Sequence, residues 1–299
     1  MDCATSVLIA PDGTGLFVRH WRRPLQRTDR TLVIVHGAGE HGGRYDHFAA
    51  RIVQSGWNVI AADARGHGRS EGVPTHIADF EHYLDDLSEI LRRASPNAER
   101  TALFAHSLGG LITARLLQTV TRPIAAAAVL SSPLLALQVR VPAVKRAIGR
   151  VCSWFAPETR FRTEVRSDQL TRSEWARKRR EEDPHSRRSV TAGWYFVVLD
   201  AAFEAWTRAD RLTTPLLVQQ GDADEVVNPQ AVLEWWSAAG STDKLFRLLP
   251  GHLHELASEP SWEETTDFVL EWLEARIPRN DGSRETTDES QRETVSPLS

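Results

Sequence analysis

The sequence has little cysteine and no excess of positive charge. Of its 299 residues only two are cysteine, Cys3 and Cys152, and neither belongs to a Cys-x-x-Cys pair or another metal-ligand spacing. A disulfide framework is therefore not expected, and a reducing compartment is the default. The formal net charge of −4 gives no reason to expect a nucleic acid partner.

Long apolar runs are absent as well. No uninterrupted apolar stretch approaches the roughly 18 residues that a membrane-spanning helix needs. The N-terminus lacks the basic segment and apolar run of a signal peptide, so we expect a soluble, cytoplasmic protein. What is present is ordinary for a globular chain: 41% hydrophobic and 25% charged residues, enough to bury a sizeable core.

Strands and helices alternate along most of the chain. A hairpin is predicted over residues 5–22, and segments with helical patterns separate the later apolar runs. These runs have strand length and lie at 31–35, 57–62, 101–104, 125–130, 215–219 and 244–249. Such alternation requires crossover connections, so the sequence predicts an α/β fold: a mostly parallel eight-stranded sheet with helices on both faces.

The alternation stops between residues 138 and 208. This segment has no apolar run typical of a central strand, and its 15 Lys and Arg against nine Asp and Glu give it a net charge of +6. The interruption predicts an inserted helical cap over the carboxyl ends of the strands, with the core in two parts, 1–137 and 209–277. Residues 278–299 lack apolar content and are predicted to be a disordered tail.

One apolar stripe inside the predicted cap has two interpretations. Its residues follow helical spacing and are Val144, Ile148, Val151, Trp154 and Phe155. Most such stripes pack onto a protein core. Because the segment is basic, the stripe is also compatible with a lid that contacts anionic lipid surfaces and admits an acyl chain.

The pentapeptide Ala105-His106-Ser107-Leu108-Gly109 follows the apolar run 101–104 and precedes a helix-forming stretch. A strand, a small-x-Ser-x-Gly turn and a helix predict a nucleophile elbow, which presents the Ser107 hydroxyl at the top of a parallel sheet. Ala105 stands where the usual pattern has glycine, and one methyl group can fit there. By itself, Ser107 is also compatible with a buried or capping serine.

A serine nucleophile needs a base, and the base needs an orienting acid. In this architecture the acid and then the histidine follow the serine along the chain. The loop after the strand at 215–219 offers two aspartates, and we favour Asp224 because Asp222 sits in the tight glycine turn. The loop after the last strand offers two histidines. We favour His254, which lies further into the loop, over the structural alternative His252.

Acyl transfer also needs hydrogen-bond donors for the developing oxyanion. We expect one to be the N–H of Leu108, at the N-terminus of a helix whose dipole favours negative charge. The second is expected in the glycine-rich loop from His36 to His41, and we nominate the N–H of Ala38. His36 itself is interpreted as a structural hydrogen-bonding residue. The spacing of the two histidines does not predict a metal site, because no set of carboxylates or cysteines accompanies them.

These segments resemble a known family. The motifs that carry the resemblance are His36-Gly-Ala-Gly-Glu-His-Gly-Gly-Arg-Tyr45, Asp63-Ala-Arg-Gly-His-Gly-Arg-Ser70, His106-Ser-Leu-Gly-Gly110, Gly221-Asp-Ala-Asp224 and His252-Leu-His-Glu-Leu256. They look like the monoacylglycerol lipase and lysophospholipase branch of the α/β-hydrolases, a serine aminopeptidase S33-type domain, over about residues 5 to 276. Two features depart from the family: Ala105 in the elbow, and a cap whose sequence is only loosely similar.

The resemblance implies an α/β-hydrolase fold with Ser107, Asp224 and His254 as the catalytic triad and with Ala38 and Leu108 as the oxyanion hole. It implies a serine hydrolase that cleaves carboxylic esters of single-chain lipids, monoacylglycerol or lysophospholipid, through an acyl-enzyme and without a cofactor. The expected partner is a small lipid ester, with transient membrane-surface contact through the cap. Two alternatives remain: a carboxylesterase for small soluble esters, and a non-catalytic scaffold, which predicts a lost triad member.

Overall fold

The computed structural model of the chain describes residues 1–24, 28–95 and 97–279. The tail predicted over 278–299 lies outside the described residues, apart from Pro278 and Arg279. No helix in the described ranges is both long and apolar enough to cross a membrane.

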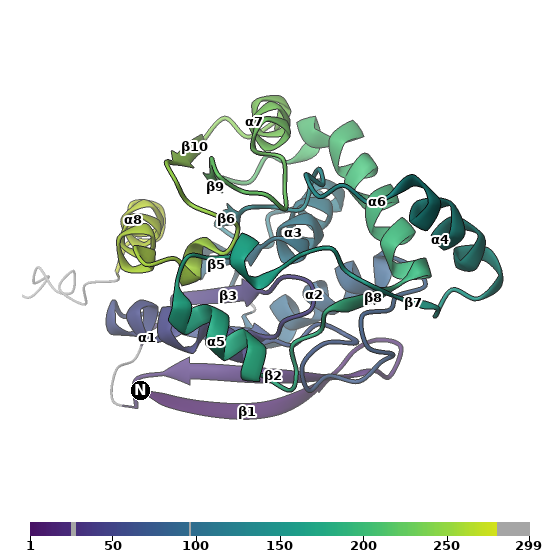
Figure 1. The fold of residues 1–299 in the computed structure, drawn as a ribbon. Helices are drawn as coiled ribbons and strands as arrows, with labels where there is room; N and C mark the ends of the chain where they lie inside the picture. The colour runs from purple at the N-terminus through teal and green to yellow at the C-terminus, as the bar shows by residue number, and fades with distance from the viewer. Residues whose placement is uncertain (25–27, 96, 280–299) are drawn as a thin grey trace, which may run out of the picture.

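A central sheet of eight strands organises the fold (Figure 1). Its strand order is β1-β2-β4-β3-β5-β6-β9-β10, and only the pairs β1–β2 and β2–β4 are antiparallel. The mostly parallel sheet predicted from the alternation is therefore confirmed. Its strands are β1 (Asp2–Ile9), β2 (Gly15–Arg22), β3 (Thr31–Val35), β4 (Asn58–Ala62), β5 (Thr101–His106), β6 (Ala127–Ser131), β9 (Leu216–Gly221) and β10 (Lys244–Leu249).

Helices cover both faces of the sheet. Successive side chains of a strand point to opposite faces, so each face has a buried cluster of its own. In β3, Leu32 and Ile34 belong to one buried cluster and Val33 to the other. The first cluster is closed by α1 (Asp46–Gln54) and α8 (Trp262–Glu274). The second is closed by four helices: α2 (Glu81–Ala94), α3 (Leu108–Thr119), α6 (Ala192–Thr207) and α7 (Pro229–Ala238).

The strands β3, β5, β9 and β10 are parallel, with β6 between β5 and β9. All of them end at the same edge of the sheet. The loop 36–41 follows β3, and Ser107 follows β5 directly. Asp224 lies in the loop after β9, and His254 in the loop after β10. The topology therefore delivers every candidate site residue to one edge, as ligand sites in open α/β sheets require.

Between residues 138 and 208 the chain forms α4 (Ala143–Phe155), β7 (Arg160–Arg162), α5 (Glu174–Glu182), β8 (Ser189–Thr191) and α6. None of these joins the central sheet, as expected. The strands β7 and β8 pair with each other in a two-stranded antiparallel sheet, which the expectation of a purely helical segment missed. Short turns of 3-10 helix complete the described elements: η1 (Gly42–Tyr45), η2 (Ala98–Arg100), η3 (Ser167–Gln169), η4 (Ala209–Arg211) and η5 (Leu256–Ser258).

The apolar stripe of α4 faces away from the protein. Its five side chains are 52% to 82% exposed, with Trp154 at 69% and Phe155 at 82%. The helix rests on α6 through its opposite face, where Gly149 is buried and the Arg150 guanidinium stacks 3.8 Å from the Phe196 ring centroid. The interpretation that this stripe packs onto the core is therefore wrong.

Candidate active site

Ser107 occupies the sharp turn between β5 and α3. Its backbone φ of +52° lies in a region that residues with a Cβ rarely adopt, so the surrounding structure must hold the turn in place. Strand and helix approach so closely that a Cβ on Gly109 would lie 2.1 Å from the Val35 carbonyl oxygen. Ala105 is fully buried, so the structure accommodates the methyl group that departs from the usual glycine.

Ser107, His254 and Asp224 form a continuous hydrogen-bonded series. The Nε2 atom of His254 lies 2.9 Å from Ser107 Oγ, and its Nδ1 atom lies 2.8 Å from Asp224 Oδ2. The second oxygen of Asp224 accepts the backbone N–H groups of Val226 and Val227, so the carboxylate has a fixed orientation. All three side chains are buried, which keeps water from competing for these hydrogen bonds.

The electrostatics of this series suit a general base. Burial opposes the charged form of His254, but the adjacent Asp224 carboxylate outweighs it and raises the pKa of His254 above its ordinary value. Burial likewise opposes ionised Asp224, and His254 together with two backbone N–H groups lowers the pKa of Asp224. The pair therefore favours an imidazolium beside a carboxylate, the charge state that forms when the histidine accepts a proton.

The two alternative residues lie elsewhere. Asp222 accepts the backbone N–H of Gly251 at 2.6 Å and braces the turn between two loops. His252 points away from Ser107, since its Nε2 lies 2.7 Å from Ser261 Oγ and its Nδ1 lies 3.0 Å from the Pro250 carbonyl oxygen. The structure thus brings Asp224 and His254 to the serine and leaves Asp222 and His252 in supporting positions.

The nominated oxyanion donors flank Ser107. Leu108 is the first residue of α3, and the loop containing Ala38 passes directly beside the serine, because a Cβ on Gly37 would lie 3.2 Å from Ser107 Cβ. Within the described residues, neither the Ala38 N–H nor the Leu108 N–H has a protein hydrogen-bond partner. Both groups therefore remain able to donate to an oxygen on the substrate.

His36 holds the loop that contains Ala38 in place. Its Nε2 accepts the backbone N–H of Ala64 at 2.8 Å, and its Nδ1 lies 2.8 Å from the Gly37 carbonyl oxygen. Both ring nitrogens are thus used within the protein, which agrees with the structural role expected for His36. Among the described residues no group of three or more His, Cys, Asp or Glu side chains is placed to hold a metal ion.

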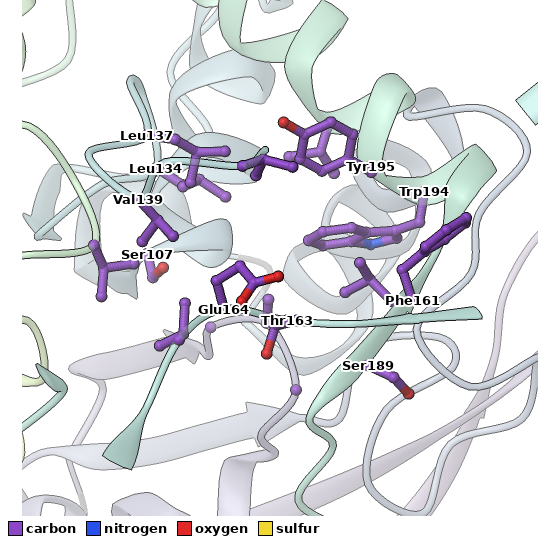
Figure 2. Close-up of a pocket in the computed structure, with 18 of the residues that line it drawn as sticks. Ser107, Leu134, Leu137, Val139, Phe161, Thr163, Glu164, Ser189, Trp194 and Tyr195 are labelled. Carbon is purple, nitrogen blue, oxygen red and sulfur yellow. The ribbon is translucent and has the colours of Figure 1, made fainter. Parts of the chain in front are cut away.

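Ser107 opens into a cavity of about 210 Å³ with a mainly apolar lining. In Figure 2, Leu134, Leu137 and Val139 gather on the Ser107 side of this pocket, whereas Trp194 and Phe161 lie toward its other side. The wall combines the segment after β6 with β7, β8 and α6, so residues 138–208 supply much of it. An apolar chain fits such a lining.

Comparison with known proteins places this chain in a family. A family model described as "Serine aminopeptidase, S33" matches residues 26–261, most of the chain. The chain belongs to this family. The resemblance drawn from the motifs and the α/β-hydrolase fold are both confirmed.

Several proteins with named activities are similar to the chain over most of its length. Monoglyceride lipase of Rattus norvegicus is 30% identical, covering 90% of each chain. Phospholipase YtpA of Bacillus subtilis is 29% identical over 82% of this chain and 95% of its own. The crystal structure of Paleococcus ferrophilus monoacylglycerol lipase superposes with a TM-score of 0.79 at 29% identity, covering 87% of this chain and 99% of that chain. Another, longer relative aligns over only 30% of its own length.

A buried charge network in this S33 protein was not anticipated from the sequence. Glu40 accepts the Gly37 N–H at 2.6 Å and pairs with Arg44, whose Nε lies 3.1 Å from Glu40 Oε2. Arg44 also pairs with Glu255 at 2.8 Å, and Arg180 of α5 reaches the same carboxylate at 3.1 Å. The network ties the loop beside Ser107 to α5 through the residue that follows His254.

Only part of this network has a signal in the sequence. Glu40 and Arg44 stand four residues apart in the glycine-rich segment 36–45, and Glu255 adjoins His254. A charged pair at this spacing is also typical of an exposed surface, so burial could not be inferred. The contact between Arg44 and Glu255 joins positions 211 residues apart, and nothing in the local sequence indicates it.

Proposed function

We propose that the chain is a serine hydrolase that cleaves the carboxylic ester of single-chain lipids, monoacylglycerols or lysophospholipids, through an acyl-enzyme on Ser107. The observation that carries this proposal is the hydrogen-bonded series Ser107–His254–Asp224, which opens into an apolar pocket. Its catalytic residues are then Ser107 as nucleophile, His254 as base and Asp224 as acid.

In the acylation step, His254 Nε2 accepts the hydroxyl proton while Ser107 Oγ forms a bond to the ester carbonyl carbon. The carbonyl oxygen becomes an oxyanion, to which the N–H groups of Ala38 and Leu108 donate. Each such donor typically contributes about 2.7–4 kcal/mol to transition-state stabilisation. The bond from carbon to the alcohol oxygen then breaks, and His254 gives its proton to that oxygen.

In the deacylation step, a water molecule takes the place of the alcohol. His254 accepts a proton from the water, whose oxygen bonds to the acyl carbon, and returns it to Ser107 Oγ as the fatty acid leaves. Asp224 stays ionised throughout and stabilises the imidazolium. No step requires a cofactor.

The pocket lining supports a lipid ester over a small soluble ester. Leu134, Leu137, Val139, Trp194 and Phe161 offer apolar surface in excess of what an acetyl or butyryl group could contact. A chain buried there gains about 0.8 kcal/mol per methylene. A carboxylesterase for small esters would be better served by a narrow, polar entrance. The relatives named monoglyceride lipase and phospholipase add support for the lipid ester.

We propose further that residues 138–208 act as a cap on a core formed by 1–137 and 209–277, and that the cap contacts lipid surfaces. The outward-facing stripe of α4 supports this proposal, because each of its five apolar side chains is more than half exposed. The net charge of +6 on the same segment favours an anionic surface. Such contact would bring the pocket to its substrate.

The test is turnover of a long-chain monoacylglycerol, a lysophosphatidylcholine and short-chain nitrophenyl esters by wild type and by Ser107→Ala. We expect activity to be highest on the long-chain lipids and to be lost in the variant. A preference for short esters would replace the lipid proposal with a carboxylesterase. Silence of the wild type on all three would favour the non-catalytic scaffold, in which the intact triad has no role.

A further inference from the structure

The pocket around Ser107 carries more positive than negative charge. Its cationic lining residues are Lys145, Arg146, Arg162, Arg180 and Arg187, and its anionic lining residues are Glu40, Glu164 and Glu255. Each carboxylate already has a cationic partner: Arg44 for Glu40, Lys145 for Glu164, and both Arg44 and Arg180 for Glu255. Every carboxylate that lines the pocket is therefore already paired with a cation of the protein.

Three arginines of the lining remain without a carboxylate partner. In the described parts of the chain, the guanidinium groups of Arg146 and Arg162 make no hydrogen bond or ion pair, and that of Arg187 donates only to the Pro184 carbonyl oxygen. Like charges that face one cavity repel each other unless an anion lies among them. These exposed arginines of the pocket wall are therefore available to pair with an anionic group on the ligand.

A second cavity adjoins the first on the side of Arg162. This polar cavity, which we call the arginine chamber, measures about 840 Å³ and is lined by residues 162–168 together with Arg177, Arg180, Glu181 and Arg188. It shares the segment 162–165 and Arg180 with the Ser107 pocket. Figure 2 shows two residues of the shared segment, Thr163 and Glu164, among the lining of the Ser107 pocket.

Each carboxylate that lines the arginine chamber also has a cationic partner. Its carboxylates pair with Lys145 (Glu164), Arg166 (Asp168) and Arg188 (Glu181). Of the chamber arginines, Arg162 is the one that has no partner and also faces the Ser107 pocket. Guanidinium groups match the geometry of phosphate oxygens, with which they form paired, charge-assisted hydrogen bonds.

We propose that the arginine chamber is a head-group subsite for a phosphate monoester, so that the favoured substrate is a single acyl chain esterified to a phosphorylated polyol. The chain occupies the apolar pocket, the ester lies at Ser107, and the phosphate lies against Arg162 and Arg180. This inference rests on the ester hydrolysis proposed above and assigns its substrate class. A phosphate monoester fits better than a neutral glycerol, because it brings nearly two negative charges at neutral pH.

The first experiment compares octanoylglycerol with octanoylglycerol phosphate, both below their critical micelle concentrations so that no lipid surface contributes. We expect kcat/KM of the wild type to favour the phosphate about tenfold or more, and Arg162→Gln to lower this ratio about tenfold. The matched control is Arg140→Gln, which removes an equal charge from the same segment but lines neither cavity. It should leave the ratio unchanged.

A second measurement tests the subsite without turnover. Calorimetric titration of Ser107→Ala with octyl phosphate, 1-O-octylglycerol and inorganic phosphate should show the tightest binding for octyl phosphate. Adding Arg162→Gln should weaken that binding about tenfold, since it removes a charge-assisted contact. Weak binding of inorganic phosphate alone would show that the chain and the phosphate are recognised together.

The outcomes separate this inference from the proposed function. Equal turnover of the two esters, with a ratio that Arg162→Gln does not change and octyl phosphate bound no better than octylglycerol, would overturn the subsite and leave ester hydrolysis standing. Absence of turnover on both esters would overturn ester hydrolysis, and the titration alone would then decide the subsite. Equal losses in Arg162→Gln and Arg140→Gln would reduce the effect to the general charge of the segment and overturn the assignment.

Discussion

At the scale of single residues, the site depends on what each buried polar group contacts. Asp224 and Asp222 stand two positions apart, yet one accepts from His254 at 2.8 Å and the other from the Gly251 backbone. The same contrast separates His254 from His252. Identical side chains thus take different roles because the loop after each strand turns one toward Ser107 and the other toward a neighbouring loop.

Replacing the proposed acid tests this assignment directly. Asp224→Asn should lower kcat by about 10⁴, because the amide cannot hold His254 in the correct tautomer or stabilise the imidazolium. Asp222→Asn is the matched control and should stay within about a factor of three, since an amide oxygen can still accept the Gly251 N–H. Steady-state kinetics on one ester suffice, and a larger loss in Asp222→Asn would reverse the assignment.

The pH profile of kcat/KM reports the ionisation of His254. The general base must be neutral, so activity is lost as pH falls through the pKa of His254, which Asp224 raises above the ordinary 6.5. We expect the ascending limb above pH 6.5 in wild type and at lower pH in Asp224→Asn. A limb that lies below pH 6.5 in wild type, or that does not move in the variant, would contradict the ion pair.

Glu40 is expected to act as a positioning residue. It accepts the Gly37 N–H next to Ala38 and pairs with Arg44, so Glu40→Gln, which loses this ion pair, should let the loop shift, misplace one oxyanion donor and lower kcat roughly 10- to 100-fold with little change in KM. The exposed Glu234→Gln serves as control for loss of one negative charge. If the thermal midpoint of Glu40→Gln falls so far that its unfolded fraction accounts for the whole loss of kcat, the role of Glu40 is purely structural.

The sequence is informative about residues whose order is imposed by the fold and uninformative about those joined by packing. Ser107, Asp224 and His254 each follow a strand, and the parallel sheet delivers strand ends to one edge, so their proximity can be predicted. Arg44 and Glu255 meet only because two loops fold against each other. No local pattern encodes that contact.

At the scale of elements, α4 shows the limit of pattern reasoning. Its helical spacing is evident from residues 144 to 155, and the structure confirms a helix there. Which way the stripe points depends on what the helix packs against, and the small residue Gly149 lets its other face lie on α6. The two-stranded sheet of β7 and β8 was missed for a similar reason, since three residues such as Arg-Phe-Arg carry no periodicity.

The exposed stripe predicts binding to anionic vesicles. Trp154→Ser combined with Phe155→Ser should reduce binding more than tenfold, because burying each aromatic side chain contributes about 1.5–3 kcal/mol. Phe203→Ser on α6 is the control, as Phe203 is 70% exposed but lies outside the stripe. Sedimentation with anionic and neutral vesicles at low salt measures the effect. Negligible binding of the wild type to both would discard the membrane contact.

At the scale of the whole molecule, three contacts among the described residues join the segment 138–208 to the two loops that carry His254 and Ala38. Arg180 pairs with Glu255, the Arg187 N–H donates to the Gly39 carbonyl oxygen at 2.8 Å, and His41 Nε2 lies 2.8 Å from Asp183 Oδ2. The buried face of α6 adds Ala201, Ala202 and Ala205 to the same core as α3. The segment 138–208 therefore shares buried contacts with the rest of the described chain instead of meeting it at a loose boundary.

Cooperative unfolding follows from these shared contacts. Scanning calorimetry of the full chain should give one thermal transition whose calorimetric and van't Hoff enthalpies agree within about 10%. Arg180→Met should lower its midpoint by about 2–4 °C, because it leaves Glu255 with a single cationic partner. Two resolved transitions would show that residues 138–208 unfold independently and would contradict the shared core.

The central claim is that Ser107 is the activated nucleophile of an apolar ester site. Its most direct measurement is peptide mass spectrometry after reaction with a fluorophosphonate that bears a long alkyl chain, compared across wild type, Ser107→Ala and His254→Ala. We predict one adduct per chain, located on Ser107, formed at least 100-fold more slowly in His254→Ala and absent from Ser107→Ala. An adduct on another residue, or labelling of Ser107 at the same rate without His254, would contradict the account.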